Sequence, residues 1–396
     1  MIKLPHPNIW KLFVIKGCLW FMVIMPVIVL FFQDQGLSLQ EIMILQACYS
    51  LSLGITEIPS GYAADTLGRR KTLILGCILA FVGFSIFSIS YDFWWFLIAQ
   101  IFLGLGNSFI SGADTALLYD SLLEVNEEDR FLKYEGRSVS IGNFAEAGAG
   151  ILGGFLAALS FRYPAYAQVV VAVITIPFAL ALVEPKTQTK RLERSWQSIL
   201  YVVKFSLKES KILRTYIIYS AIMGIGTLMM AWLAQPFLKD IGVGMKNYGV
   251  IWALLNVLVG TIAFLAYKID RKLSPINSML MIGVTSVLGY VLIAQNMNYW
   301  GLAVLFIFYA NRGYATPLLR NYINRHTESN IRATVMSIRS FIIRTSFAVI
   351  APFIGWVADH QGLSSAMMAM SMIIAVVGGL CLIWFYRNQK QTELGR

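Results

Sequence analysis

Long apolar stretches alternate with short polar segments along the whole chain. A membrane-spanning helix needs about 20 predominantly apolar residues, and twelve stretches of the sequence have this character. They lie near 11–32, 38–63, 72–90, 94–122, 138–160, 164–183, 212–238, 247–267, 275–294, 299–322, 334–358 and 363–386. The pattern predicts an all-α polytopic membrane protein with twelve transmembrane helices. An even number of spans places both termini on the same side of the membrane.

The longest polar interruption, residues 184–211, separates six predicted helices from six. We therefore expect an N-terminal bundle over 1–183, a linker over 184–211, and a C-terminal bundle with a short tail over 212–396. Charged residues alternate in the linker with Trp196, Ile199 and Leu200. This alternation fits a helix lying on the membrane surface, and a solvated linker fits it equally well.

Composition supports a membrane protein. Apolar residues make up 57% of the chain and charged residues 13%, against about 25% charged residues in average soluble domains. The net charge of +11 could indicate nucleic-acid binding, but 24 of the 32 Lys and Arg residues lie in or next to one set of alternate loops and the terminal segments. The opposite loops hold only Arg162, Lys239 and Lys246. By the positive-inside rule both termini are cytoplasmic, so the charge predicts topology in a plasma (bacterial inner) membrane and no nucleic-acid partner.

Other protein classes find little support in the sequence. The apolar run Leu12–Phe32 is too long for the core of a cleaved signal peptide. The cysteines Cys18, Cys48, Cys77 and Cys381 stand singly in apolar stretches, which indicates neither disulfides nor a metal site. HExxH, GxSxG and GxxxxGK[ST] motifs are absent from the sequence. We expect no metal, cofactor or catalytic residue, and a polytopic membrane enzyme is kept only as a remote alternative.

A repeated motif supports the division into two halves. Small-x-x-x-Asp followed by basic residues occurs at 61–71, after the second predicted helix, and again at 266–272, after the eighth. The two aspartates, Asp65 and Asp270, are 205 residues apart. Related six-helix halves are the arrangement in which transporters form a binding site at the repeat interface, near the membrane midplane.

The first copy of this motif carries a resemblance to the major facilitator superfamily of secondary transporters. Its matching positions are Gly61, Asp65, Gly68, Arg69, Arg70 and Lys71. The resemblance implies two pseudo-symmetric bundles, transport by alternating access, and a motif that acts as a conformational latch. From the residues themselves, Gly61 would permit close helix approach, Gly68 a tight turn, and Asp65 a contact with a helix N-terminus or a base. A role in fixing topology alone stays open.

Two further segments bear on the type of transporter. The run from Gly142 to Gly154 resembles the Gly-Pro-x-x-Gly-Gly motif of drug–proton antiporters, but Ala149-Gly150 replaces Gly-Pro. The same run would give a small-residue face for tight helix packing. Gln100 stands where such antiporters usually carry an intramembrane Arg, which argues against a standard drug antiporter.

Ionisable residues inside the predicted helices are candidates for function because charges are costly at membrane depth. The acids Glu57, Asp114 and Glu146 lie in the N-terminal half and are proton-coupling candidates. Asp114 and Glu146 lie at similar depth, about 12 Å from one end of their helices, which predicts a shared polar pocket. Lys16, one turn inside the first helix, is expected to extend its amine to the interface.

The corresponding bases, Arg312, Arg339 and Arg344, lie in the C-terminal half. Arg312 and Arg344 are expected about 15 Å deep, where they could hold an anionic group of the substrate or pair with Asp114 and Glu146. Aromatic and amide residues could line the same cavity: Tyr216, Tyr219, Trp232, Gln235, Asn256, Tyr309 and Asn311.

These features predict a monomeric secondary active transporter, coupled to protons, that moves a small organic solute across the lipid bilayer. Two directions stay open at this point. Export of an amphipathic compound agrees with the degenerate glycine motif, whereas uptake or exchange of an anionic metabolite or siderophore-like compound agrees with the buried arginines.

Overall fold

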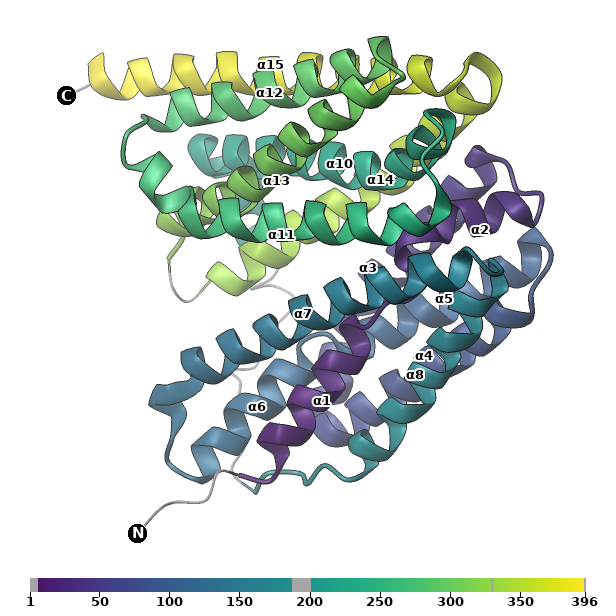
Figure 1. Ribbon diagram of the computed structural model, residues 1–396. Coiled ribbons are helices and arrows are strands. Elements are labelled where there is room, and N and C mark those ends of the chain that lie inside the picture. Colours follow the sequence, from purple (N-terminus) through teal and green to yellow (C-terminus); the bar gives the residue numbers. More distant parts are fainter. Residues whose placement is uncertain (1–5, 187–200, 329–330, 395–396) are drawn as a thin grey trace. The chain divides into compact units, whose positions relative to one another are not determined.

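The computed structural model describes residues 6–186, 201–328 and 331–394, which form helices joined by short connections and contain no strand. The chain divides into two compact units (Figure 1). The first comprises Met1–Leu37, Ile44–Arg191 and Gly244–Ala253, and the second comprises Ser38–Met43, Leu192–Val243 and Leu254–Arg396.

Among the described residues, eleven helices are long and apolar enough to cross a membrane, or twelve if one bent pair is a single span. The bent pair, Leu39–Glu57 and Pro59–Thr66, turns by 44°, because proline removes a backbone donor and clashes with the preceding turn. The predicted all-α polytopic fold is confirmed.

Helices from α1 to α8 build the first unit. They are α1 (Asn8–Trp20), η1 (Met25–Val27), α2 (Ile28–Asp34), α3 (Leu39–Thr66), α4 (Arg69–Ile89), α5 (Phe93–Ile110), α6 (Ala113–Glu124), η2 (Glu128–Arg130), α7 (Phe131–Ala157) and α8 (Arg162–Leu180). Only the first residues of α3 belong to the second unit.

Two spans of the first unit, expected as continuous helices over 11–32 and 94–122, are broken. The first separates into α1 and α2 with Pro26 at the restart, and the second breaks at Gly112, whose φ of +83° suits glycine. At the first break the Val23 N–H donates to the buried Gln168 Oε1 at 2.8 Å. Backbone groups freed at membrane depth need such partners.

Glycines of α7 allow that helix to approach the break in the first span. A Cβ at Gly153 would lie 2.0 Å from the Val23 carbonyl oxygen, and one at Gly142 would lie 2.8 Å from the Trp20 ring. The expected packing role of the glycine run is thus present in the first unit.

The second unit contains six long helices, which are labelled in Figure 1. They are α10 (Lys211–Asp240), α11 (Met245–Asp270), α12 (Pro275–Gln295), α13 (Tyr299–Arg325), α14 (Arg332–Gln361) and α15 (Leu363–Leu394), preceded by η3 (Phe205–Glu209). The first turns of α11 belong to the first unit. The Tyr290 hydroxyl ties α12 to α10 by donating to the Gly226 carbonyl at 2.6 Å.

One predicted helix has a different start in the structure, and one falls on residues that the structure does not describe. The helix predicted over 138–160 begins seven residues earlier, at Phe131, because the polar residues before Ser138 continue the helix instead of forming a loop. The surface helix predicted around Trp196, Ile199 and Leu200 lies outside the described residues.

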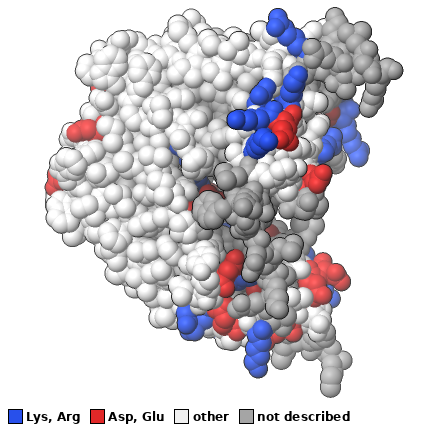
Figure 2. Space-filling view, turned by 180° about the vertical axis from the view of Figure 1, so that it is seen from behind, with Lys and Arg blue, Asp and Glu red and all other residues white. Residues whose placement is uncertain are grey.

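Charged side chains are unevenly distributed over the surface. On the face shown in Figure 2, Lys, Arg, Asp and Glu gather in a few groups and leave a broad uncharged area. Exposed large apolar residues such as Phe144, Phe264 and Val349 are in keeping with helices that contact lipid.

Candidate functional site

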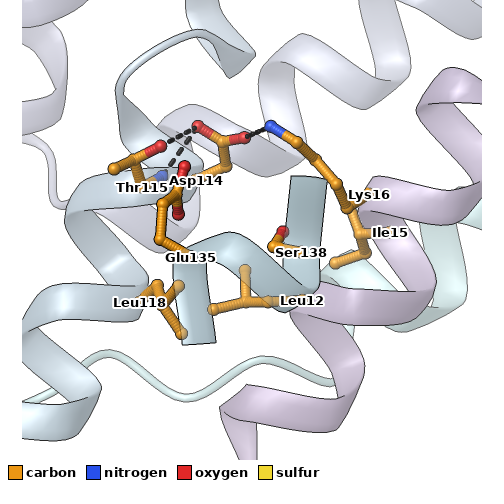
Figure 3. A pocket seen from close by; sticks show the side chains of 8 residues that line it. All are labelled: Leu12, Ile15, Lys16, Asp114, Thr115, Leu118, Glu135 and Ser138. Atoms are coloured by element: carbon orange, nitrogen blue, oxygen red, sulfur yellow. Dashed lines mark hydrogen bonds and ion pairs between the residues drawn. The ribbon is translucent and has the colours of Figure 1, made fainter. Parts of the chain in front are cut away.

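A polar cluster lies between α1, α6 and α7 in the first unit (Figure 3). The Lys16 Nζ donates to Asp114 Oδ2 at 2.8 Å, and the two side chains are only 17% and 14% exposed. The other carboxylate oxygen of Asp114 accepts the Thr115 N–H at 2.7 Å. The carboxylate of this buried ion pair is therefore also held by a backbone hydrogen bond.

The break in the fourth span explains why Asp114 lies where it does. The helix α5 ends at Ile110, and Gly112 is the N-cap from which α6 begins at Ala113, so Asp114 occupies the first turn of α6. Helix N-termini favour negative charge because their N–H groups lack intrahelical partners. The break thus supplies Asp114 with a favourable local dipole inside the membrane span.

A second carboxylate, Glu135, lines the same cavity together with Ser138 of α7. Leu12, Ile15 and Leu118 complete the lining. The cavity measures about 10 Å³, close to the lower limit for one water molecule. Its size suits a proton or a water and excludes an organic solute.

The cluster differs from the polar pocket expected from the sequence. Asp114 lies in it, but Glu146 and Glu57 do not line the cavity, and Lys16 pairs with Asp114 instead of reaching to the interface. Lys16 lies eight residues from the start of α1, and Asp114 was expected at the same distance from the end of its helix. Equal depth in the membrane could therefore have predicted the pair from the sequence. Glu135 was missed because it was expected in a loop.

The motif at 61–71 takes part in a second charged network at one end of the unit. Both oxygens of Glu184 accept backbone N–H groups at the start of α4, from Arg69 and Arg70, each at 2.8 Å. The Arg69 side chain pairs with the fully buried Asp120 of α6 and also donates to the Ala116 carbonyl.

The structure shows the conformation and exposure of the individual motif residues. Gly68 has a φ of +98°, so the tight turn expected there is present. A Cβ at Gly61 would meet nothing within 4 Å, so no described neighbour accounts for the close approach expected at that glycine, which stays a prediction. Lys71 and Asp65 are exposed. The carboxylate that Arg69 contacts is Asp120, which was not among the candidate residues from the sequence.

A buried histidine precedes α1. Burial lowers the pKa of His6, while the nearby Glu124 opposes this shift and Lys11 adds to it. Its Nδ1 accepts the Asn8 N–H at 3.2 Å, which requires an unprotonated Nδ1. The neutral imidazole is thus the form that the fold favours.

The arginine candidates all lie in the second unit. The Arg312 guanidinium lies 5.6 Å from the centre of the Tyr309 ring. Arg339 is 6% exposed and its Nε donates to the Ser220 hydroxyl at 2.6 Å. The Arg344 Nε is buried without a hydrogen-bond partner among the described residues.

Several aromatic and amide candidates serve packing inside the second unit. The Asn311 amide donates to the Ile282 carbonyl and the Ser286 hydroxyl of α12, at 3.2 and 3.0 Å. The Tyr219 hydroxyl donates to the Met279 carbonyl. The others that are buried are Tyr216, Trp232, Gln235 and Tyr309, whereas Asn256 is half-buried.

An apolar groove lies beside the polar cluster, between α1, α7 and α8. It measures about 450 Å³ and is lined by Phe13, Val14, Gly17, Cys18, Phe21, Ile141, Ala145, Val171 and Ile174. It has the volume of small-ligand sites, but its lining offers no charged group.

Comparisons with known proteins agree with these features. The sequence profile of the Major Facilitator Superfamily matches residues 12–351. The chain belongs to this superfamily. The quinolone resistance protein NorA of Staphylococcus aureus (strain COL) is 20% identical over 311 residues, covering 76% of this chain and 77% of NorA. The uncharacterized MFS-type transporter YxaM of Bacillus subtilis (strain 168) is 21% identical over 362 residues, covering 89% and 88%.

Solved structures of superfamily members have the same fold. The nucleoside transporter NupG superposes with a TM-score of 0.80 at 13% identity, covering 96% of this chain and 98% of NupG. A D-xylose–proton symporter superposes with a TM-score of 0.74 at 15% identity, covering 96% and 97%. The chain is therefore a multi-pass secondary transporter of the Major Facilitator Superfamily and not an enzyme.

Proposed function

We propose that this superfamily member is a proton-coupled transporter that moves a small organic solute by alternating access of its two bundles. The observation that carries the proposal is the Lys16–Asp114 ion pair with Glu135 lining the same small cavity. Ionisable residues inside membrane helices are costly and mark ion and proton pathways in transporters.

The charges of the cluster suit one proton. With all three groups ionised, Lys16 offsets one carboxylate and the cluster carries a net charge of −1. Binding of one proton to Asp114 or Glu135 makes it neutral, which is the cheaper state at low dielectric. The cavity of about 10 Å³ admits the proton but leaves the solute to bind elsewhere.

Binding of this proton would affect the contact between two helices that border the broken spans. Lys16 lies on α1 and Asp114 on α6, and each of these helices ends or begins at a break in its span. Protonation of Asp114 would remove the counter-charge of Lys16 and weaken the connection between the two helices. Discontinuous helices of this kind recur at the ion and substrate sites of transporters.

We extend the proposal to topology and assembly. The Lys and Arg distribution supports cytoplasmic termini in a plasma (bacterial inner) membrane, and we propose a monomer. NorA is named for quinolone resistance and the xylose protein for proton symport, so these relatives leave both export and uptake open for this chain. The direction in which protons move relative to the solute distinguishes the two.

The test uses proteoliposomes that contain a luminal pH dye and no ATP. A panel of organic solutes, including a quinolone, is added outside, and luminal pH and solute uptake are recorded together. We expect at least one solute to move with a pH change, and Asp114→Asn to abolish that change. The control is Asp92→Asn, which alters only the N-cap of α5. Solute movement without a pH change, or an unchanged response in Asp114→Asn, would contradict the proposal.

A further inference from the structure

From α10 to α15, positive charges lie inside the helices, whereas the acids lie at helix ends or in connections. The sequence from Lys211 to Leu394 contains five acids, each within the last three residues of a helix or in a connection: Asp240, Asp270, Glu328, Asp359 and Glu393. In contrast, Arg312, Arg339 and Arg344 lie within α13 and α14, away from their ends. The helix interiors of this unit therefore carry an excess of positive charge.

Arg312 has the most central position of the three. Thirteen residues of α13 precede it and thirteen follow it, so it lies about 20 Å from either end of the helix. Its guanidinium faces the Tyr309 ring at 5.6 Å, a contact that leaves its N–H donors available to another partner. Arg is charged under all physiological conditions, so Arg312 cannot escape the cost of its depth by losing a proton.

The other two arginines also have no acid as a partner among the described residues, and the positive charge of Arg320 acts on Arg339. The Arg339 Nε donates to the Ser220 hydroxyl, and the Arg344 Nε is buried with no hydrogen-bond partner in the part of the chain that the structure describes. Among the described residues, the ion pairs include neither of these arginines nor Arg312. Charges of this kind in membrane helices face a water-filled pathway or a counter-charge.

We infer that the transported solute is an organic anion and that Arg312 is its principal contact, with Arg344 adding to the positive potential. The inference rests on the proposed transport function and names the substrate class. A guanidinium binds carboxylate or phosphate through two parallel hydrogen bonds. An organic anion would supply the negative charge that the helices of this unit lack.

The test measures charge preference at Arg312 without knowledge of the solute. Thr316 lies one helical turn after Arg312 and is exposed, so Thr316→Cys places a thiol on the same helix face. The full chain with its four native cysteines replaced by serine is reacted with an anionic methanethiosulfonate (2-sulfonatoethyl) and with a cationic one (2-trimethylammonioethyl). The ratio of the two rates is compared with the ratio for N-acetylcysteine.

We expect the relative preference for the anionic reagent to exceed that of the free thiol at least about fivefold, because a unit charge within one helical turn contributes this much even in a partly aqueous site. Arg312→Gln should remove the preference, and Arg312→Lys should keep it. The matched control Arg325→Gln, at an exposed arginine nine residues beyond Thr316 at the end of the same helix, should leave it unchanged.

Three results would overturn the inference: a rate ratio equal to that of N-acetylcysteine, a preference that survives Arg312→Gln, or a thiol that neither reagent reaches. The second would show that the positive potential arises elsewhere, and the first that a carboxylate of the chain already neutralises Arg312. Monodisperse elution of each variant on size exclusion excludes misfolding. The labelling uses no proton gradient, so its outcome is independent of the proton coupling assigned to Asp114.

Discussion

At the scale of single residues, the ion pair between Lys16 and Asp114 determines most of the chemistry inside the first unit. A buried ion pair as a whole adds little to the free energy of unfolding, because the cost of desolvating both charges offsets their attraction. Removing one partner, however, leaves an uncompensated charge in the interior. The pair is also the feature that sequence reasoning approached most closely. Asp114 was recognised from its depth, whereas the role of Lys16 depended on which neighbouring helix it faces, and the sequence of one helix does not contain that information.

A double-mutant cycle tests the pair. We expect Lys16→Met and Asp114→Asn each to lower the free energy of unfolding by about 3 kcal/mol. The double variant should be more stable than either single variant, because it leaves no unpaired charge. Thermal unfolding of the purified protein in detergent, calibrated by denaturant, gives the values. Additive losses would show that the two side chains do not interact.

At the scale of elements, breaks and close contacts place the polar cluster. Gly112 and Pro26 are visible in the sequence, but each falls inside a long apolar stretch that hydropathy alone reads as one helix. Their effect depends on partners that supply hydrogen bonds at the break, such as Gln168 for Val23. The glycines of α7 were predicted to pack closely, and the position of their neighbour, the irregular backbone of the first span, could not be predicted.

Gly153 provides a test of this packing. Because its Cβ would lie 2.0 Å from the Val23 oxygen, we expect Gly153→Ala to destabilise the protein by at least about 2 kcal/mol and to reduce transport. The matched control is Gly136→Ala in the same helix, where a Cβ meets nothing within 4 Å. That change should raise stability by about 0.5–1 kcal/mol through helix propensity. Equal effects of the two substitutions on thermal unfolding would contradict the assignment.

At the scale of the whole molecule, hydropathy and one motif were sufficient to predict the fold and the superfamily. Membrane helices must satisfy their backbone internally and span a fixed thickness, so their number and type follow from sequence length and polarity. The distribution of charge between the units was equally visible, with acids inside the first and arginines inside the second. The acid that shares a cavity with Asp114 could not be identified from the sequence, because the position of Glu135 depends on where α7 begins.

The central claim is that the cluster around Asp114 exchanges a proton within the membrane, and pH-difference infrared spectroscopy of the reconstituted protein tests it most directly. We expect the wild type to show a titrating carboxylic C=O band that is lost in Asp114→Asn or Glu135→Gln. The band should be retained in Glu41→Gln, a substitution at the exposed start of α3. Identical difference spectra for the wild type and both cluster variants would contradict proton exchange at this site.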